Sequence, residues 1–209
     1  MSPLPDTGAT LTLLRGADLA PSAWKNGGGV TREIAARAAA GASPDGFAWR
    51  ASLADIERAG PFSRFEGIER TLVLINGAGL LLDETNAEGR EPRLTHALER
   101  VLDVARFAGE SSVDARLIAG PVRVFNLMVR TGAARGALDV WPQGGQRTVR
   151  ARTVLVHAVQ GPVDVSVDGG DAIALAPGDT LQVEAQQAVD IASRGDGALL
   201  VATLDLVQA

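Results

Sequence analysis

Trp24-Lys25-Asn26-Gly27-Gly28-Gly29-Val30-Thr31-Arg32-Glu33-Ile34 joins a glycine-rich turn to a strand. Three consecutive glycines let the backbone take positive φ and approach another group closely. The residues after them alternate as in a strand, with Thr31 and Glu33 on one face. An aromatic ring, a cation, an amide and a carboxylate would thus lie close to the glycine backbone, as in many sites for small polar ligands. The same residues also fit a plain turn before a strand, with Trp24 as a core side chain.

Length and composition place limits on the class of protein. The 209 residues suffice for one large β domain or two small modules that share a core. A net charge of −5 gives no general attraction for nucleic acid or anionic lipid, and the lack of cysteine excludes disulfides and thiol catalysis. The first twenty residues lack the pattern of a signal peptide, and no apolar run approaches the length of a membrane helix. We therefore expect a cytoplasmic protein without nucleic-acid or membrane partners.

Two strands with mixed faces are predicted by alternation. Phe47–Leu53 has an aromatic and aliphatic face opposite Arg50 and Ser52, which fits a half-buried strand with polar groups directed at water or at a cavity. Val122–Arg130 places a second mixed set on one face, consisting of Val122, Val124, Asn126, Met128 and Arg130. This set fits the wall of a cavity, or an Asn126 that only satisfies a neighbouring backbone group.

Some segments lack this alternation. Gly60–Arg70 has the glycine and proline of an irregular loop but also carries aromatic, basic and hydroxyl side chains, namely Phe62, Ser63, Arg64, Phe65 and Arg70. Such a loop either packs down as a lid or lines a site. Residues 54–59 and 94–100 are the segments expected to be helical.

The chain contains a weak internal repeat. Arg70–Gly77 resembles Arg152–Val156, and Phe107–Glu110 corresponds to Ala176–Asp179. An apolar strand ends each of the two repeated parts. Many short strands, frequent turn signals and two related halves predict an all-β fold with little helix, built as a double sandwich or barrel.

Known catalytic and metal-binding patterns are mostly missing. Gly170–Val183 resembles the second conserved motif of cupin barrels, and that resemblance implies a metal site of a His-x-His pair, a Glu and a further His. The chain has only His96 and His157, far apart in sequence, so we expect neither a metal nor another cofactor. Ser63 lacks a nucleophile elbow, and no catalytic residue is assigned. Acid–base chemistry by Glu33 with Lys25 stays open.

Four segments together resemble the HutD/Ves family of bicupin proteins: Trp24–Ile34, Trp49–Ala54, Gly60–Arg70 and Phe125–Arg130. They occur in the family's order, and the resemblance extends from about residue 11 to residue 206. One position departs from the family pattern, because Val124 stands where the family typically has Asp before Phe-Asn. If that Asp belongs to the family's site, ligand preference or affinity differs in this protein.

The resemblance implies a bicupin, which consists of two fused cupin-like (RmlC-like) jelly-roll barrels, here without the usual metal ligands. Residues 1–140 would form the N-terminal barrel with the motifs and the pocket, and residues 141–209 a C-terminal barrel that is mainly scaffold. The resemblance also implies a modulator of bacterial histidine utilisation that binds a small anionic metabolite, such as urocanate or formylglutamate. Cupin folds often pair through exposed strands, so a homodimer is one expected assembly, and the sequence leaves the oligomeric state open.

The candidate ligand-binding residues supply charge, hydrogen bonds and apolar walls. Four basic side chains suit a carboxylate, with the paired N–H groups of arginine best matched to it: Lys25, Arg50, Arg64 and Arg130. Polar contacts would come from Asn26, Thr31, Glu33, Ser52, Ser63 and Asn126, and apolar walls from Trp24, Phe62 and Met128. Binding should weaken strongly in Arg64→Ala or Lys25→Ala.

Two other functions remain open from the sequence. The first is a metal-independent isomerase or hydrolase that acts on a histidine-pathway intermediate, with Glu33 and Lys25 as the acid–base pair. The second is a protein-interaction module whose pocket is vestigial. Turnover that is lost in Glu33→Gln while the ligand still binds would favour the enzyme, and a stable partner without metabolite binding would favour the module.

Overall fold

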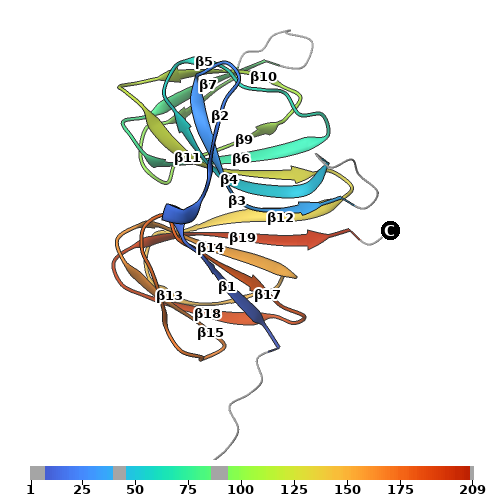
Figure 1. Ribbon diagram of the computed structural model, residues 1–209, viewed down its shortest axis with the longest axis vertical. Coiled ribbons are helices and arrows are strands. Elements are labelled where there is room, and N and C mark those ends of the chain that lie inside the picture. The colour runs from blue at the N-terminus through green and yellow to red at the C-terminus, as the bar shows by residue number, and fades with distance from the viewer. Residues whose placement is uncertain (1–7, 40–45, 86–93, 208–209) are drawn as a thin grey trace, which may run out of the picture. The chain divides into compact units, whose positions relative to one another are not determined.

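The computed structural model describes residues 8–39, 46–85 and 94–207 (Figure 1). These residues form nineteen strands and one short 3-10 helix, η1 (Gly16–Asp18). No helix within the described ranges is long and apolar enough to cross a membrane. The described residues divide into two compact units, of which one comprises Leu19–Arg135 with Val207, and the other residues 8–18 with Gly136–Leu206.

The Leu19–Arg135 unit consists of two sheets whose neighbouring strands are antiparallel. The six-stranded sheet has the order β2 (Pro21–Ala23), β3 (Gly29–Ala38), β4 (Phe47–Ile56), β11 (Val122–Arg130), β6 (Ile68–Asn76) and β9 (Val104–Ala108). The four-stranded sheet has the order β5 (Gly60–Pro61), β10 (Ser112–Leu117), β7 (Leu80–Thr85) and β8 (Leu94–Leu98). Inward-facing side chains from both sheets form the core of this unit, including Ile56, Leu72, Leu82, Phe107 and Val124.

The second unit also contains two sheets. The five-stranded sheet has the order β1 (Thr10–Leu14), β17 (Thr180–Glu184), β14 (Thr153–Gln160), β19 (Ala198–Leu206) and β12 (Ala134–Trp141). The four-stranded sheet has the order β13 (Gly145–Val149), β18 (Val189–Arg194), β15 (Val163–Val167) and β16 (Ile173–Leu175). Its core consists mainly of aliphatic side chains, among them Val154, Val156, Leu181, Val183, Leu199 and Val201.

Three segments differ from their expected place or conformation. The expected N-terminal barrel of residues 1–140 includes Thr10–Leu14, whereas β1 pairs with β17 in the other unit. The helix prediction is wrong for residues 54–59 and 94–100, because residues 54–56 end β4 and residues 94–98 form β8. In both cases backbone pairing with neighbouring strands outweighs local helix propensity, which is a weak preference.

The Asp179 carboxylate binds the residues that follow β1 and so connects the N-terminal strand to the rest of the second unit. It accepts hydrogen bonds from Arg15 Nη1 at 2.6 Å, from the Gly16 amide at 3.0 Å and from the Ala176 amide at 3.1 Å. Burial raises the pKa of Asp179, but these hydrogen bonds outweigh burial and hold the pKa below its ordinary value. The ionised form is therefore favoured by the fold.

We expect Asp179→Asn to lower the free energy of unfolding by about 2 kcal/mol at pH 7, since a charged hydrogen-bond acceptor is lost. A carboxyl group with a depressed folded pKa stabilises the fold above its unfolded pKa, and this stabilisation disappears as the pH falls through the folded pKa. The stabilities of wild type and variant should therefore converge in acid. Urea denaturation at a series of pH values tests this, and a difference that stays constant into acid would contradict it.

Candidate functional site

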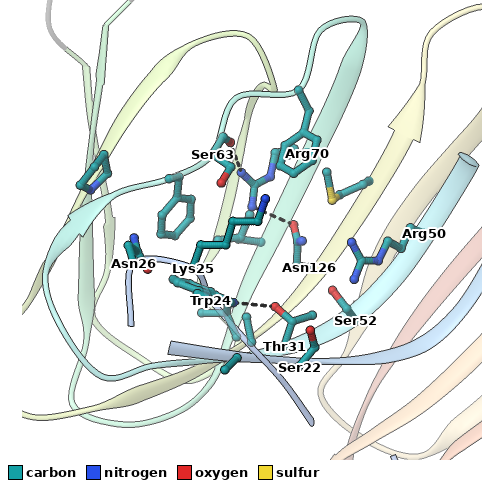
Figure 2. A pocket seen from close by; sticks show the side chains of 18 residues that line it. Ser22, Trp24, Lys25, Asn26, Thr31, Arg50, Ser52, Ser63, Arg70 and Asn126 are labelled. Carbon is teal, nitrogen blue, oxygen red and sulfur yellow. Dashed lines mark hydrogen bonds between the residues drawn. The ribbon is translucent and has the colours of Figure 1, made fainter. Parts of the chain in front are cut away.

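A pocket of about 570 Å³ lies in the Leu19–Arg135 unit, on the inner face of the six-stranded sheet (Figure 2). The strands β4, β6 and β11 form its floor, and the β2–β3 turn and the loop after β5 form its sides. The lining residues are Ser22, Ala23, Trp24, Lys25, Asn26, Thr31, Arg50, Ser52, Ala54, Pro61, Phe62, Ser63, Phe65, Arg70, Leu72, Val124, Asn126 and Met128.

Strand register brings the polar side chains of the floor together. In the pairing of β4 with β11, Asn126 lies opposite Ser52 and Met128 lies opposite Arg50. Alternate residues of a strand share a face, so both mixed faces point into the same pocket. Ser52 and Asn126 are 1% and 7% exposed, which places their polar atoms inside the unit and away from bulk water.

Arg70, on β6, is a buried guanidinium in this pocket, with 8% of the residue exposed. It donates two long hydrogen bonds of 3.5 Å, from Nη1 to the Ser63 carbonyl and from Nη2 to Asn126 Oδ1, and its Nε has no hydrogen-bond partner. No carboxylate of the described residues forms an ion pair with it. Burial and, to a smaller extent, the positive charge of Arg50 lower the pKa of Arg70 to about 10. Arg70 therefore remains charged at neutral pH.

Aromatic rings surround the Arg70 guanidinium. Its central carbon lies 5.1 Å from the ring centroid of Phe62, 5.7 Å from that of Phe65 and 5.1 Å from that of Phe107. A cation over a ring face is attracted to it, so the rings stabilise the charge while they keep water away. Phe62 in turn packs edge-on against Trp24, with centroids 6.2 Å apart. The aromatic residues fix Arg70 in position.

The turn between β2 and β3 carries the quoted glycines. Trp24 Nε1 donates to Thr31 Oγ1 at 2.8 Å, which ties the tip of the turn to the strand that follows it. Gly27 has a φ of 64°, which side chains rarely tolerate. A Cβ on Gly29 would lie 2.2 Å from the Asp55 carbonyl oxygen, so only glycine allows this approach to β4. The exposed Lys25 extends over the pocket in the direction of Asn126 and Arg70 (Figure 2).

Ten of the thirteen candidate ligand-binding residues line the pocket, namely Trp24, Lys25, Asn26, Thr31, Arg50, Ser52, Phe62, Ser63, Asn126 and Met128. Glu33 lies outside the lining and pairs with Arg50, with Oε2 2.8 Å from Nε, although that N–H does not point at the oxygen. Arg130 also lies outside it, donating to the carbonyls of Phe47 and Glu66. Arg64 is exposed and does not belong to the lining.

Arg70 is the main lining residue that is missing from the sequence-based candidates. The alternation of β6 places Arg70 on the same face as Leu72, which also lines the pocket. An arginine that occupies one of the alternating positions of buried aliphatic residues is therefore the sequence feature that could have identified it. Val124, at the position where the family resemblance gives Asp, also belongs to the lining. That departure therefore falls inside the pocket.

Comparison with known proteins agrees with this architecture. Two units of paired antiparallel sheets define a bicupin of the RmlC-like class, which confirms the predicted fold. The structure of an oxalate decarboxylase formate complex from Lactobacillus farciminis shares the fold alone, with a TM-score of 0.60 and 10% identity over 92% of this chain and 85% of that chain.

The chain belongs to the HutD family, which matches residues 4–201. A 21.2 kDa protein encoded in the hutC 3′ region of Pseudomonas putida is 38% identical over 83% of this chain and 87% of its own length. HutD from Pseudomonas fluorescens SBW25 has a TM-score of 0.78 and 33% identity, covering 95% of this chain and all of that chain. Protein Ves of Escherichia fergusonii is 35% identical over 56% of each chain. The family name links the chain to histidine utilisation.

Proposed function

We propose that the pocket of the Leu19–Arg135 unit binds the carboxylate of a small metabolite without chemical turnover, and that the protein thereby modulates histidine utilisation. The observation that carries the proposal is Arg70, a buried cation that forms no ion pair with any carboxylate of the described residues. Removing a charge from water is costly unless it is paired. A bound carboxylate would pair with Arg70 through two charged hydrogen bonds, the geometry that arginine favours.

The other lining residues support a short ligand with polar groups beyond its carboxylate. Asn126, Ser52 and Thr31 offer hydrogen-bonding atoms on the floor, and Trp24 and Met128 offer apolar contact. The binding of a drug-sized molecule commonly uses a pocket of about 300–1,000 Å³, so 570 Å³ suits a metabolite of modest size. Urocanate and formylglutamate have such groups, and the family name supports a ligand from histidine utilisation.

The same lining favours binding over catalysis. Within the described residues it contains no aspartate, glutamate, histidine, cysteine or tyrosine, which leaves the exposed Lys25 as its candidate acid–base group. Glu33, the candidate acid–base residue of the isomerase or hydrolase alternative, pairs with Arg50 outside the lining. General acid–base catalysis needs a titratable group within hydrogen-bond reach of the substrate. Sensing or buffering of a metabolite requires only a reversible complex.

Calorimetric titration of the full chain with urocanate, formylglutamate, histidine and glutamate tests this proposal. We expect saturable binding of a carboxylate ligand that is recovered unchanged. The structure changes the effects expected from the sequence for two variants. Lys25→Ala should weaken binding only about fivefold rather than strongly, because an exposed charge is screened by water. Arg64→Ala should bind like wild type, because Arg64 lies outside the lining, and this variant therefore serves as the control. Conversion of a ligand would instead support an enzyme, and the absence of heat with all four compounds would contradict the proposal.

A further inference from the structure

One end of the pocket floor is charged and the other end is apolar. We propose that the apolar end, around Val124, selects carboxylate ligands whose far end is an apolar group, and that Val124 determines this preference. The inference rests on the proposed function, since it assumes that the carboxylate binds at Arg70. It names the class of ligand, which is a short acid with an apolar ring or chain.

The side chains of β11 show how the floor changes along its length. Met128, Asn126 and Val124 alternate along this strand, so they share the face that lines the pocket. Met128 lies opposite Arg50 on β4 and opposite Arg70 on β6. Successive residues of one face are about 7 Å apart. The Arg70 guanidinium reaches Asn126, so a ligand carboxylate there needs only a short spacer to place its other end over Val124.

The floor around Val124 is built from aliphatic side chains. Its partner on β4 is Ala54, and Leu72 lies beside them on β6. These three residues are buried members of the core of this unit, against which Trp24 and Phe62 pack. All five line the pocket. A ligand group that enters this end exchanges water for apolar contacts, which favours an apolar group.

The acceptor oxygens of the β2–β3 turn are engaged by the protein itself. Thr31 is two strands away from Val124, with Ala54 between them, and its Oγ1 accepts a hydrogen bond from Trp24 Nε1 at 2.8 Å. Asn26 Oδ1 accepts a hydrogen bond from the Gly28 amide at 2.9 Å. An N–H group of a ligand at Val124 would therefore lose its hydrogen bond to water without gaining a strong one, and such a loss weakens binding.

The test compares urocanate with thienylacrylate, in which a thiophene ring replaces the imidazole ring. Both acids have the same carboxylate, the same spacer and a five-membered ring, but the thiophene ring has no N–H group. At about pH 8 the imidazole ring is neutral, so the two ligands carry equal charge. We expect calorimetry on wild type to show tighter binding of thienylacrylate, by about tenfold.

A variant of nearly equal size tests the role of Val124. Val124→Thr replaces a methyl group with a hydroxyl group, which offers the imidazole ring a hydrogen-bond partner. It should shift the ratio of affinities by about tenfold toward urocanate. The matched control is Val122→Thr, the same substitution at a buried position of β11 that lies outside the lining. This control should leave the ratio unchanged.

The outcomes separate this inference from the proposed function. If wild type binds urocanate as tightly as thienylacrylate or more tightly, or if folded Val124→Thr keeps the wild-type ratio, the role of Val124 is overturned while carboxylate binding stands. The same holds if formylglutamate binds and neither of the two acids does. If no carboxylate binds wild type, the proposed function fails and this inference with it. The wild-type comparison does not depend on the folding of any variant.

Discussion

Arg70→Met is expected to weaken carboxylate binding by at least about thirtyfold while leaving the protein as stable as wild type or more stable. Removal of one partner from a buried charged pair costs about 2–5 kcal/mol of binding free energy, which corresponds to a factor of thirty or more. The free energy of unfolding should stay the same or rise, because a buried cation without an ion pair is replaced by an apolar side chain of similar length. Calorimetry and urea denaturation measure the two effects separately.

The matched control for this variant is Arg64→Met, the same substitution at an exposed arginine of the same segment. It should leave ligand binding unchanged, because Arg64 lies outside the lining. Arg70→Lys keeps the charge but loses the two-pronged geometry, so its affinity should fall between those of wild type and Arg70→Met. Binding of wild-type strength in folded Arg70→Met would remove Arg70 from the site and with it the main support for the proposed function.

Gly29→Ala should lower the free energy of unfolding by about 3 kcal/mol, at the upper end of the usual cost of overpacking. The added Cβ would lie 2.2 Å from the Asp55 carbonyl oxygen and 3.3 Å from the Trp24 ring. The oxygen belongs to the backbone of β4 and cannot rotate away, so β3 has to separate from β4. Because Trp24 is a wall of the pocket, ligand affinity should fall as well.

Gly27→Ala is the matched control within the same glycine run. Its φ of 64° strains an alanine by about 1–2 kcal/mol, but the nearest atom to an added Cβ is the flexible end of Arg58 at 3.6 Å. The Gly29 variant should therefore be clearly less stable than the Gly27 variant in urea denaturation. Equal stabilities would show that the β3–β4 contact relaxes without cost.

The class of fold could be predicted from the sequence because a strand shows an alternating pattern among neighbouring residues. The alternation in Phe47–Leu53 and Val122–Arg130 corresponds to β4 and β11, and the quoted glycines do join a turn to a strand. Residue spacing also placed Ser52 and Asn126 on faces that proved to line one pocket. These features depend on neighbours within a few residues, so a single sequence contains them.

Helices were predicted at residues 54–59 and 94–100 because local propensity competes with strand pairing, and only the partner strands decide the outcome. The sequence also assigned β1 to the wrong unit for this reason. Its partner strand β17 is about 170 residues away in the chain, so the residues around β1 do not indicate the pairing.

The sequence alone indicated the all-β class, several of the strands and the family of this protein, whereas the tertiary structure decided the remaining strands and which side chains share the pocket. Arg70 ends a loop-like sequence, yet the pairing of β6 with β11 turns it inward beside Asn126. Glu33 and Arg130 had equally suitable chemistry, but pairing with Arg50 and with backbone carbonyls places them outside the lining. Alternation separates the two faces of a strand, but only the packing of the strands decides which face becomes a cavity wall.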